Sequence, residues 1–180
     1  FVDAMLELLP RYPEVTAVVM GRATAAHESF LQDLNNRVRA AGLKERILFL
    51  PEVPVEQMAD WYRVLDLFVA PQRWEGFGLT PLEAMACGVP VVATRTGAFE
   101  ELILEAECGF LVQPANSIEI AEGCAELVRS DSLRRSFSQR ARWRVEEDFS
   151  INSEANALND IYRKLLGKTR TEDSEPLRQN

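Results

Sequence analysis

Residues 66–97 read DLFVAPQRWEGFGLTPLEAMACGVPVVATRTG, and this stretch predicts a strand, a loop, a helix and a second strand in that order. Leu67–Ala70 and Val89–Thr94 are apolar runs of strand length, and the helical segment between them covers Pro81–Cys87. Neither run alternates between apolar and polar residues, as expected when helices cover both faces of a parallel sheet. The stretch therefore predicts a βαβ unit within an α/β domain.

The alternation of strands and helices continues on both sides of this unit. Three further strands are expected, at Val15–Met20, Ile47–Leu50 and Phe110–Val112. Four further helices are expected, at Ser29–Ala41, Met58–Leu65, Phe99–Glu105 and Ser117–Val128. Repeated βα units of this kind predict an α/β fold with a Rossmann-like, doubly wound parallel sheet.

The two ends of the sequence differ in character. From Leu133 onward the pattern is helical only, and it ends near Leu166, so residues 1–166 are expected to form one domain with C-terminal helices. Residues 167–180 are polar and without periodicity, which predicts a disordered tail. The first residues, FVDAMLELLP, have the pattern of the middle of a helix. We therefore expect the sequence to be an N-terminally truncated part of a longer protein.

Composition narrows the possible functions. The 180 residues include 20 Lys and Arg against 28 Asp and Glu, a net charge of −8. This balance argues against a nucleic-acid binder, because such binding needs basic side chains to replace the counterions of the phosphates. No apolar run is long enough to cross a bilayer. The three cysteines, Cys87, Cys108 and Cys124, show no CxxC spacing and are interpreted as free thiols.

The predicted sheet also indicates where a ligand would bind. In doubly wound folds, ligands bind at the carboxyl ends of the strands. The loops that follow those ends are Gly21–Thr24, Pro51–Val55, Pro71–Thr80 and Thr94–Ala98.

The third of these loops has the features of an anion site. Gly76 and Gly78 flank Phe77, so the backbone can turn sharply and a ligand can approach it closely. Thr80 is expected to cap the following helix, with Pro81 at the first helical position. The N–H groups of the loop and first turn would then converge on a bound anion such as a diphosphate.

Two carboxylates, Glu75 and Glu83, flank this loop and could each accept hydrogen bonds from the vicinal hydroxyls of a sugar. Each also has a structural interpretation. Thr80-x-x-Glu83 is the pattern of a capping box, and Glu75 could be a solvated loop charge. A dinucleotide-binding turn is excluded because Pro81 stands where the third glycine of that motif belongs.

Glu75 and Glu83, with seven residues between them, continue into EAMACGVPVVATRTGAFEELI. In this order they resemble the donor-binding half of glycosyltransferase family four, retaining enzymes of the GT-B fold with two Rossmann-like domains. The likeness also includes ILFLPEVP at 47–54 and GFLVQPAN at 109–116, and it extends to about Leu166. The sequence RWEGFGLTPLEAMA at 73–86 is most similar to that of bacterial lipopolysaccharide core mannosyltransferases.

The resemblance implies a role for each matching residue. Glu75 would face the hexose, as the candidate catalytic residue although not as a nucleophile, and Glu83 would hold the ribose 2′ and 3′ hydroxyls. The N–H groups of Phe77, Gly78 and Leu79 would meet sugar hydroxyls and the distal phosphate. The implied donor-binding residues are Gly21, Arg22, Glu52, Val53, Glu75, Gly76, Phe77, Gly78, Leu79, Thr80 and Glu83. Arg22 could pair with phosphate or face solvent.

The chain also departs from the family pattern. The family's first strand of this domain, with its Arg and Lys-Gly, would precede Phe1, and so would the domain that binds the glycan or glycolipid acceptor. Without them we expect weak donor binding and no activity. His27 lies in the first βα segment, so it is interpreted as a surface residue at a helix start and not as the histidine of the family's N-terminal domain.

No Asp-x-Asp motif occurs in the chain, which agrees with leaving-group stabilisation without a metal, and no cofactor is expected. The resemblance implies GDP-mannose as the first choice of donor and a UDP-hexose as the second. It also implies a cytoplasmic location, either free or at the inner face of the cytoplasmic membrane. A sugar-nucleotide epimerase of the same fold and a non-catalytic nucleotide-sugar-binding fragment are the alternative functions.

Two further features have structural interpretations. The arginines between Arg134 and Arg144 are interpreted as a solvated helix face, with a membrane-surface patch as the alternative. Trp61 and Tyr62 are interpreted as packing residues.

Overall fold

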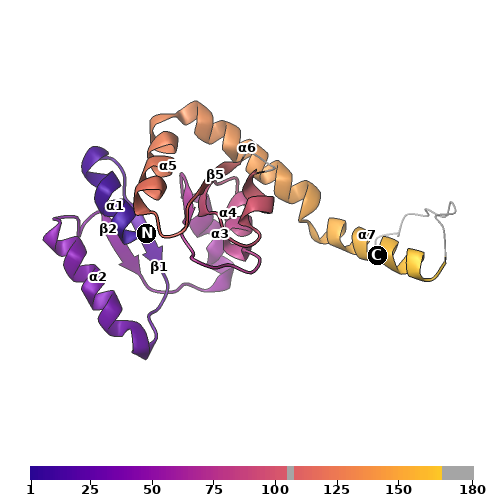
Figure 1. Ribbon diagram of the computed structural model, residues 1–180, viewed down its shortest axis with the longest axis horizontal. Coiled ribbons are helices and arrows are strands. Elements are labelled where there is room, and N and C mark those ends of the chain that lie inside the picture. Colours follow the sequence, from indigo (N-terminus) through magenta and orange to yellow (C-terminus); the bar gives the residue numbers. More distant parts are fainter. Residues whose placement is uncertain (105–107, 168–180) are drawn as a thin grey trace.

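The computed structural model describes residues 1–104 and 108–167, and its ribbon is drawn in Figure 1. Its strands are β1 (Ala17–Met20), β2 (Ile47–Leu50), β3 (Phe68–Ala70), β4 (Val91–Thr94) and β5 (Gly109–Val112). All three strand pairs, β1–β2, β3–β4 and β4–β5, are parallel. The predicted strands and the α/β class are thus confirmed.

Helices precede the first strand, connect the strands and follow the last of them. They are α1 (Val2–Leu8), α2 (Glu28–Ala40), α3 (Val55–Arg63), α4 (Leu79–Ala86), α5 (Ser117–Arg129), α6 (Asp131–Asp148) and α7 (Ile151–Leu165). Short 3₁₀ turns cover Leu9–Arg11 and Ala25–His27. The helix predicted at Phe99–Glu105 is a π-helical segment over Glu100–Leu104. The predicted tail lies outside the described residues, apart from Gly167.

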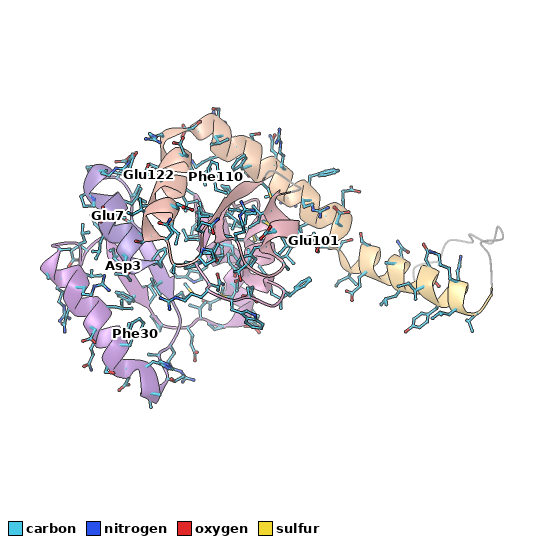
Figure 2. The ribbon with its side chains drawn as sticks, viewed as in Figure 1. Asp3, Glu7, Phe30, Glu101, Phe110 and Glu122 are labelled. Carbon is cyan, nitrogen blue, oxygen red and sulfur yellow. The ribbon has the colours of Figure 1, made fainter. Side chains whose placement is uncertain are left out.

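The C-terminal helical region is two helices and not one. The helix α6 ends at Asp148, and the hydroxyl of Ser150 then accepts the N–H of Ser153 as the N-cap of α7. Figure 1 shows α7 extending away from the rest of the molecule. Its side chains stand clear of the body in Figure 2, and nearly all of them are exposed.

The strands form two sheets, β1-β2 and β3-β4-β5, where one continuous sheet was expected. Val18 and Met20 of β1 and Phe68 and Val69 of β3 line a cleft of about 670 Å³. Neighbouring strands must lie about 4.8 Å apart to share hydrogen bonds. The division of the sheet thus coincides with the cleft between β1 and β3.

The strand β4 is buried on both faces. Val92 packs in one apolar cluster with residues of α1 and α5, among them Leu8 and Leu127. Val91 and Ala93, on the opposite face, pack in a second cluster with Met85 of α4 and with Phe99. This arrangement confirms the interpretation of the apolar run as a strand covered by helices on both sides.

Helices α5 and α6 complete this covering. Phe110 of β5, labelled in Figure 2, makes an edge-to-face contact with Phe137 of α6, with ring centroids 5.4 Å apart. Among the described helices, none is long and apolar enough to cross a membrane.

The three cysteines are free thiols, as expected, and they differ in environment. Burial raises the pKa of Cys108 to about 11 and that of Cys124 to about 12. Cys87 is half-buried at the end of α4, and its Sγ lies 3.8 Å from the carbonyl oxygen of Ala59. Because the thiolate is the nucleophilic form, both buried thiols should be inert near neutral pH.

We therefore predict that iodoacetamide at pH 8 alkylates Cys87 first in the folded protein. Cys108 and Cys124 should react at a comparable rate only after denaturation, since they are both buried and protonated at this pH. Mass spectrometry of peptides from folded and urea-treated protein measures the three rates. A Cys87→Ser variant serves as the control and should lose the fast reaction. Fast alkylation of Cys124 in the folded protein would contradict the packing of the core.

Candidate functional site

The loop between β3 and α4 is held in place by the end of β4. Thr94 is completely buried, and its hydroxyl donates a hydrogen bond of 2.5 Å to the carbonyl of Gln72. A longer contact of 3.4 Å joins the same hydroxyl to the carbonyl of Ala70. Thr94 therefore ties the last residue of β3 and the start of the loop to the neighbouring strand.

Gly97 supports the middle of the same loop. Its φ is +54°, and a Cβ atom built on it would lie 1.9 Å from the carbonyl oxygen of Glu75. Only glycine fits a left-handed backbone at such a close approach. The segment after β4 thus packs directly against the peptide of Glu75. Thr94–Ala98 was among the predicted ligand loops, but this contact between two loops was not predicted.

The helix α4 begins at Leu79, with Gly78 as its N-cap at a φ of +92°. A Cβ on Gly78 would lie 2.4 Å from Cε1 of Phe99, which is fully buried. The prediction of Thr80 as the N-cap is wrong, because the left-handed backbone at Gly78 starts the helix earlier. Pro81 is consequently the third helical residue, still within the turn where N–H groups lack intrahelical partners.

The capping-box interpretation of Thr80 and Glu83 is also wrong. Among the described residues no side chain caps α4, and the Oε2 atom of Glu83 instead accepts a 2.8 Å hydrogen bond from the hydroxyl of Tyr62. The N–H groups of Leu79 and Thr80 belong to the first turn, which offers them no intrahelical acceptor. This end of α4 is therefore free to receive hydrogen-bond acceptors from a ligand and presents the positive end of the helix dipole.

Glu75 organises the loop that precedes α4. The side chain is half-buried, and its Oε1 atom accepts hydrogen bonds from the N–H groups of Gly76 and Phe77, at 2.9 and 3.4 Å. Glu75 is therefore not a freely solvated loop charge, which was the alternative interpretation of this residue. The N–H of Phe77 was predicted to meet a sugar hydroxyl. In the structure it donates the 3.4 Å hydrogen bond to Glu75.

Three large apolar side chains of this loop region are exposed. Trp74 is 80% exposed, Leu79 65% and Phe77 51%. Exposed large apolar side chains close together in the sequence are a candidate surface for a ligand or another protein.

A second group of predicted residues lies at the ends of β1 and β2. Gly21 has a φ of +145° and donates its N–H to the carbonyl of Leu50 at 3.1 Å. Arg22 faces Glu52, with Nη1 and Oε1 3.8 Å apart and both side chains largely exposed. The structure thus gives Arg22 a carboxylate partner at the surface. Val53, in the same turn, is half-buried.

The two groups of residues are separate in their contacts. In the described part of the chain, no hydrogen bond or ion pair joins the Arg22–Glu52 pair to the loop before α4. Of the predicted donor-binding residues, Thr80 lines the cleft between β1 and β3, and so does Met20, the residue before Gly21.

Two other predictions concern surface residues. His27 is exposed and its Nδ1 atom lies 2.7 Å from the hydroxyl of Thr24, so its interpretation as a surface residue at the start of α2 is confirmed. At least three of the five arginines of α6 form ion pairs with acids of the same helix, namely Arg134 with Asp131, Arg142 with Glu146 and Arg144 with Asp148. The side chain of Arg142 is 62% exposed, but those of Arg134 and Arg144 are only 24% and 16% exposed, so the interpretation as a solvated helix face fits Arg142 and not the other two.

Tyr62 is the residue near the site that sequence reasoning missed. Its ring does pack, edge-to-face against Phe68 with centroids 5.8 Å apart. Its hydroxyl, however, makes the only hydrogen bond that the described residues give to the side chain of Glu83. No short motif links two residues 21 positions apart, so only the fold could reveal the pair.

Comparison with known proteins gives a consistent result. Residues 1–144 match the family of glycosyl transferases group 1. Over 168 residues the chain is 46% identical to the lipopolysaccharide core biosynthesis mannosyltransferase LpsB of Rhizobium meliloti (strain 1021), covering 92% of this chain and 47% of that protein. The chain thus spans about half the length of this curated relative.

Two solved structures illustrate the likeness in fold. One is the C-terminal domain of the glycosyl transferase group 1 family protein LpcC from Francisella tularensis, with 38% identity, a TM-score of 0.79 and coverage of 84% of this chain and 78% of that chain. The other is Anabaena HepE in complex with UDP-glucose, with 24% identity, a TM-score of 0.80 and coverage of 91% and 44%. The chain therefore belongs to the glycosyl transferases group 1 family and has the fold of the C-terminal domain of such an enzyme.

Proposed function

We propose that this chain is the donor-binding half of a retaining hexosyltransferase that transfers mannose from GDP-mannose to a glycan or glycolipid such as lipopolysaccharide core. The observation that carries the proposal is the uncapped start of α4, flanked by the carboxylates Glu75 and Glu83. Membership of a glycosyltransferase family supports a nucleotide-sugar as the ligand of this site.

In this proposal the diphosphate lies at the N-terminus of α4. The N–H groups of Gly78, Leu79 and Thr80 donate hydrogen bonds to the distal phosphate, and the helix dipole favours its charge. As the bond to the sugar breaks, negative charge grows on the departing nucleoside diphosphate. Preorganised N–H groups stabilise that charge, so the chemistry needs neither a metal nor a cofactor from this domain.

The carboxylates recognise the two sugars of the donor. Glu83 holds the ribose 2′ and 3′ hydroxyls, and Glu75 faces the transferred hexose through its Oε2 atom while Oε1 keeps the loop folded. Glu75 is the catalytic residue of this half. Gly76 leaves room for the hexose to approach the backbone, whereas the missing side chain of Gly78 makes room for the buried ring of Phe99.

The ends of β1 and β2 complete the pocket. Gly21 keeps the approach to the diphosphate open, and the main chain of Glu52 and Val53 reads the base. Surface ion pairs contribute little to stability, so Arg22 can leave Glu52 and pair with a phosphate when the donor binds.

The choice of mannose rests on the relative named as a lipopolysaccharide core mannosyltransferase. The acceptor would be held by the other half of the enzyme, and a lipid-anchored acceptor places the reaction at the inner face of the cytoplasmic membrane.

Calorimetry on the full-length enzyme tests the donor. We expect GDP to bind more tightly than UDP, and GDP-mannose to be consumed only when an acceptor glycan is present. Tighter binding of UDP would replace mannose by a UDP-hexose, the donor class bound in the HepE structure. Conversion of the nucleotide-sugar without acceptor would indicate an epimerase instead.

Glu83→Gln tests the ribose contact. The amide keeps the size of the side chain and can still accept the Tyr62 hydrogen bond, so the melting temperature should hardly change. Donor affinity should fall by about 1.5–3 kcal/mol, the usual contribution of hydrogen bonds to a charged group. Glu154→Gln, on the distant helix α7, is the matched control and should leave binding unaltered. Equal affinity of the Glu83→Gln and Glu154→Gln proteins would refute the ribose assignment.

Glu75→Gln should have a different effect. Its amide oxygen can still accept the N–H groups of Gly76 and Phe77, so the loop should keep its shape and nucleotide affinity should change little. Turnover should fall on the order of 100-fold, because a charge near the reacting carbon is lost. Steady-state kinetics and calorimetry on the same preparation separate the two effects. A variant with full turnover would remove Glu75 from the catalytic site.

A further inference from the structure

Tyr62 lies on α3, on the side of that helix that faces α4. Its side chain is only 4% exposed, and it belongs to a small cluster with Ala84 and Val89. The ring is fixed by its edge-to-face contact with Phe68 of β3. Because residues of two elements pack against the buried ring, its orientation is fixed, and so is the position of its hydroxyl.

That point is the carboxylate of Glu83. The hydroxyl of Tyr62 donates to Oε2 at 2.8 Å, while Glu83 itself is exposed on the surface of α4. Burial, followed by the bond to Glu83, raises the pKa of Tyr62, so the phenol keeps its proton and remains a donor. An exposed glutamate on a helix normally samples several rotamers, whereas this one is anchored by a rigid donor.

We propose that Tyr62 is a positioning residue for the nucleotide ribose. This inference rests on the proposed function, in which Glu83 binds the ribose hydroxyls. Tyr62 occupies one lone pair of Oε2 and fixes the plane of the carboxylate, leaving Oε1 and the remaining lone pair of Oε2 for the two hydroxyls. A single rotamer is thus set before the donor arrives, and ordering of the side chain no longer weakens binding.

The simpler interpretation is that a buried phenol needs some acceptor and finds Glu83. Under that interpretation, removing the hydroxyl would alter packing but would not distinguish between ligands that differ only in their ribose. The two interpretations therefore predict different results for a donor nucleotide and its 2′,3′-dideoxy counterpart.

The test is a double-mutant cycle in the full-length enzyme, with calorimetric affinities for GDP and 2′,3′-dideoxy-GDP. The proteins are the parent, Tyr62→Phe, Glu83→Ala, the double variant, and Tyr162→Phe on the exposed face of α7 as the control. If GDP binds less tightly than UDP, UDP and its dideoxy form take their place.

We expect Tyr62→Phe to weaken GDP binding about tenfold, the scale of one hydrogen bond to a charged group. Binding of dideoxy-GDP should be unchanged, and the substitution should have no further effect when Glu83 is already alanine. Tyr162→Phe should match the parent. Even if Tyr62→Phe lowers the melting temperature, the ratio of this variant's affinities for GDP and dideoxy-GDP remains a valid measure, because both affinities are measured on the same folded fraction.

Three results would overturn the inference. Equal weakening of GDP and dideoxy-GDP by Tyr62→Phe would show a general effect on the pocket. An unchanged GDP affinity in Tyr62→Phe, with a loss in Glu83→Ala, would remove Tyr62 and leave the proposed function intact. No loss in Glu83→Ala would refute the ribose role of Glu83, and the role of Tyr62 with it.

Discussion

The left-handed backbone of Gly78 is the constraint on which the rest of the site depends. It places the first turn of α4 directly after the loop, in contact with the buried ring of Phe99. Because the helix begins there, Thr80 lies within the first turn and does not cap it. Glu83 in turn has no cap to complete, and its carboxylate is available to Tyr62. The open N–H groups and the anchored carboxylate are therefore two consequences of one backbone conformation.

The start of α4 also shows how an acidic chain could bind an anionic ligand. A chain with a net charge of −8 does not attract a nucleoside diphosphate through its overall field. Attraction has to be local, and the structure offers it through a helix terminus, whose partial positive charge needs no basic residue. Two basic residues at the strand ends already face carboxylates, Arg22 facing Glu52 and Arg95 facing Glu100. The proposed donor site would thus rely on oriented dipoles more than on full charges.

Much of the fold could be predicted from the sequence, because apolar runs and helical periodicity mark buried strands and covering helices directly. The run Val89–Thr94 is an example, since its residues are buried on both faces in the structure. The start of α4 could not be predicted in the same way. Thr80 and Pro81 fit the usual preferences for a helix start, and only the contact between Gly78 and Phe99 overrides them. The division of the sheet and the Tyr62–Glu83 bond depend on distant packing, which short patterns do not encode.

The cleft between β1 and β3 has a consequence for how this polypeptide behaves on its own. Within residues 1–104 and 108–167, each of these strands is hydrogen-bonded to a neighbour strand on one side only, and residues of both strands line the cleft. Main-chain amides and carbonyls along such edges are templates for any extended peptide. In concentrated solution or during refolding, intermolecular β-sheet formation would compete with the monomer at this place. The two open strand edges are therefore the places in the described structure where a further extended segment could add to either sheet.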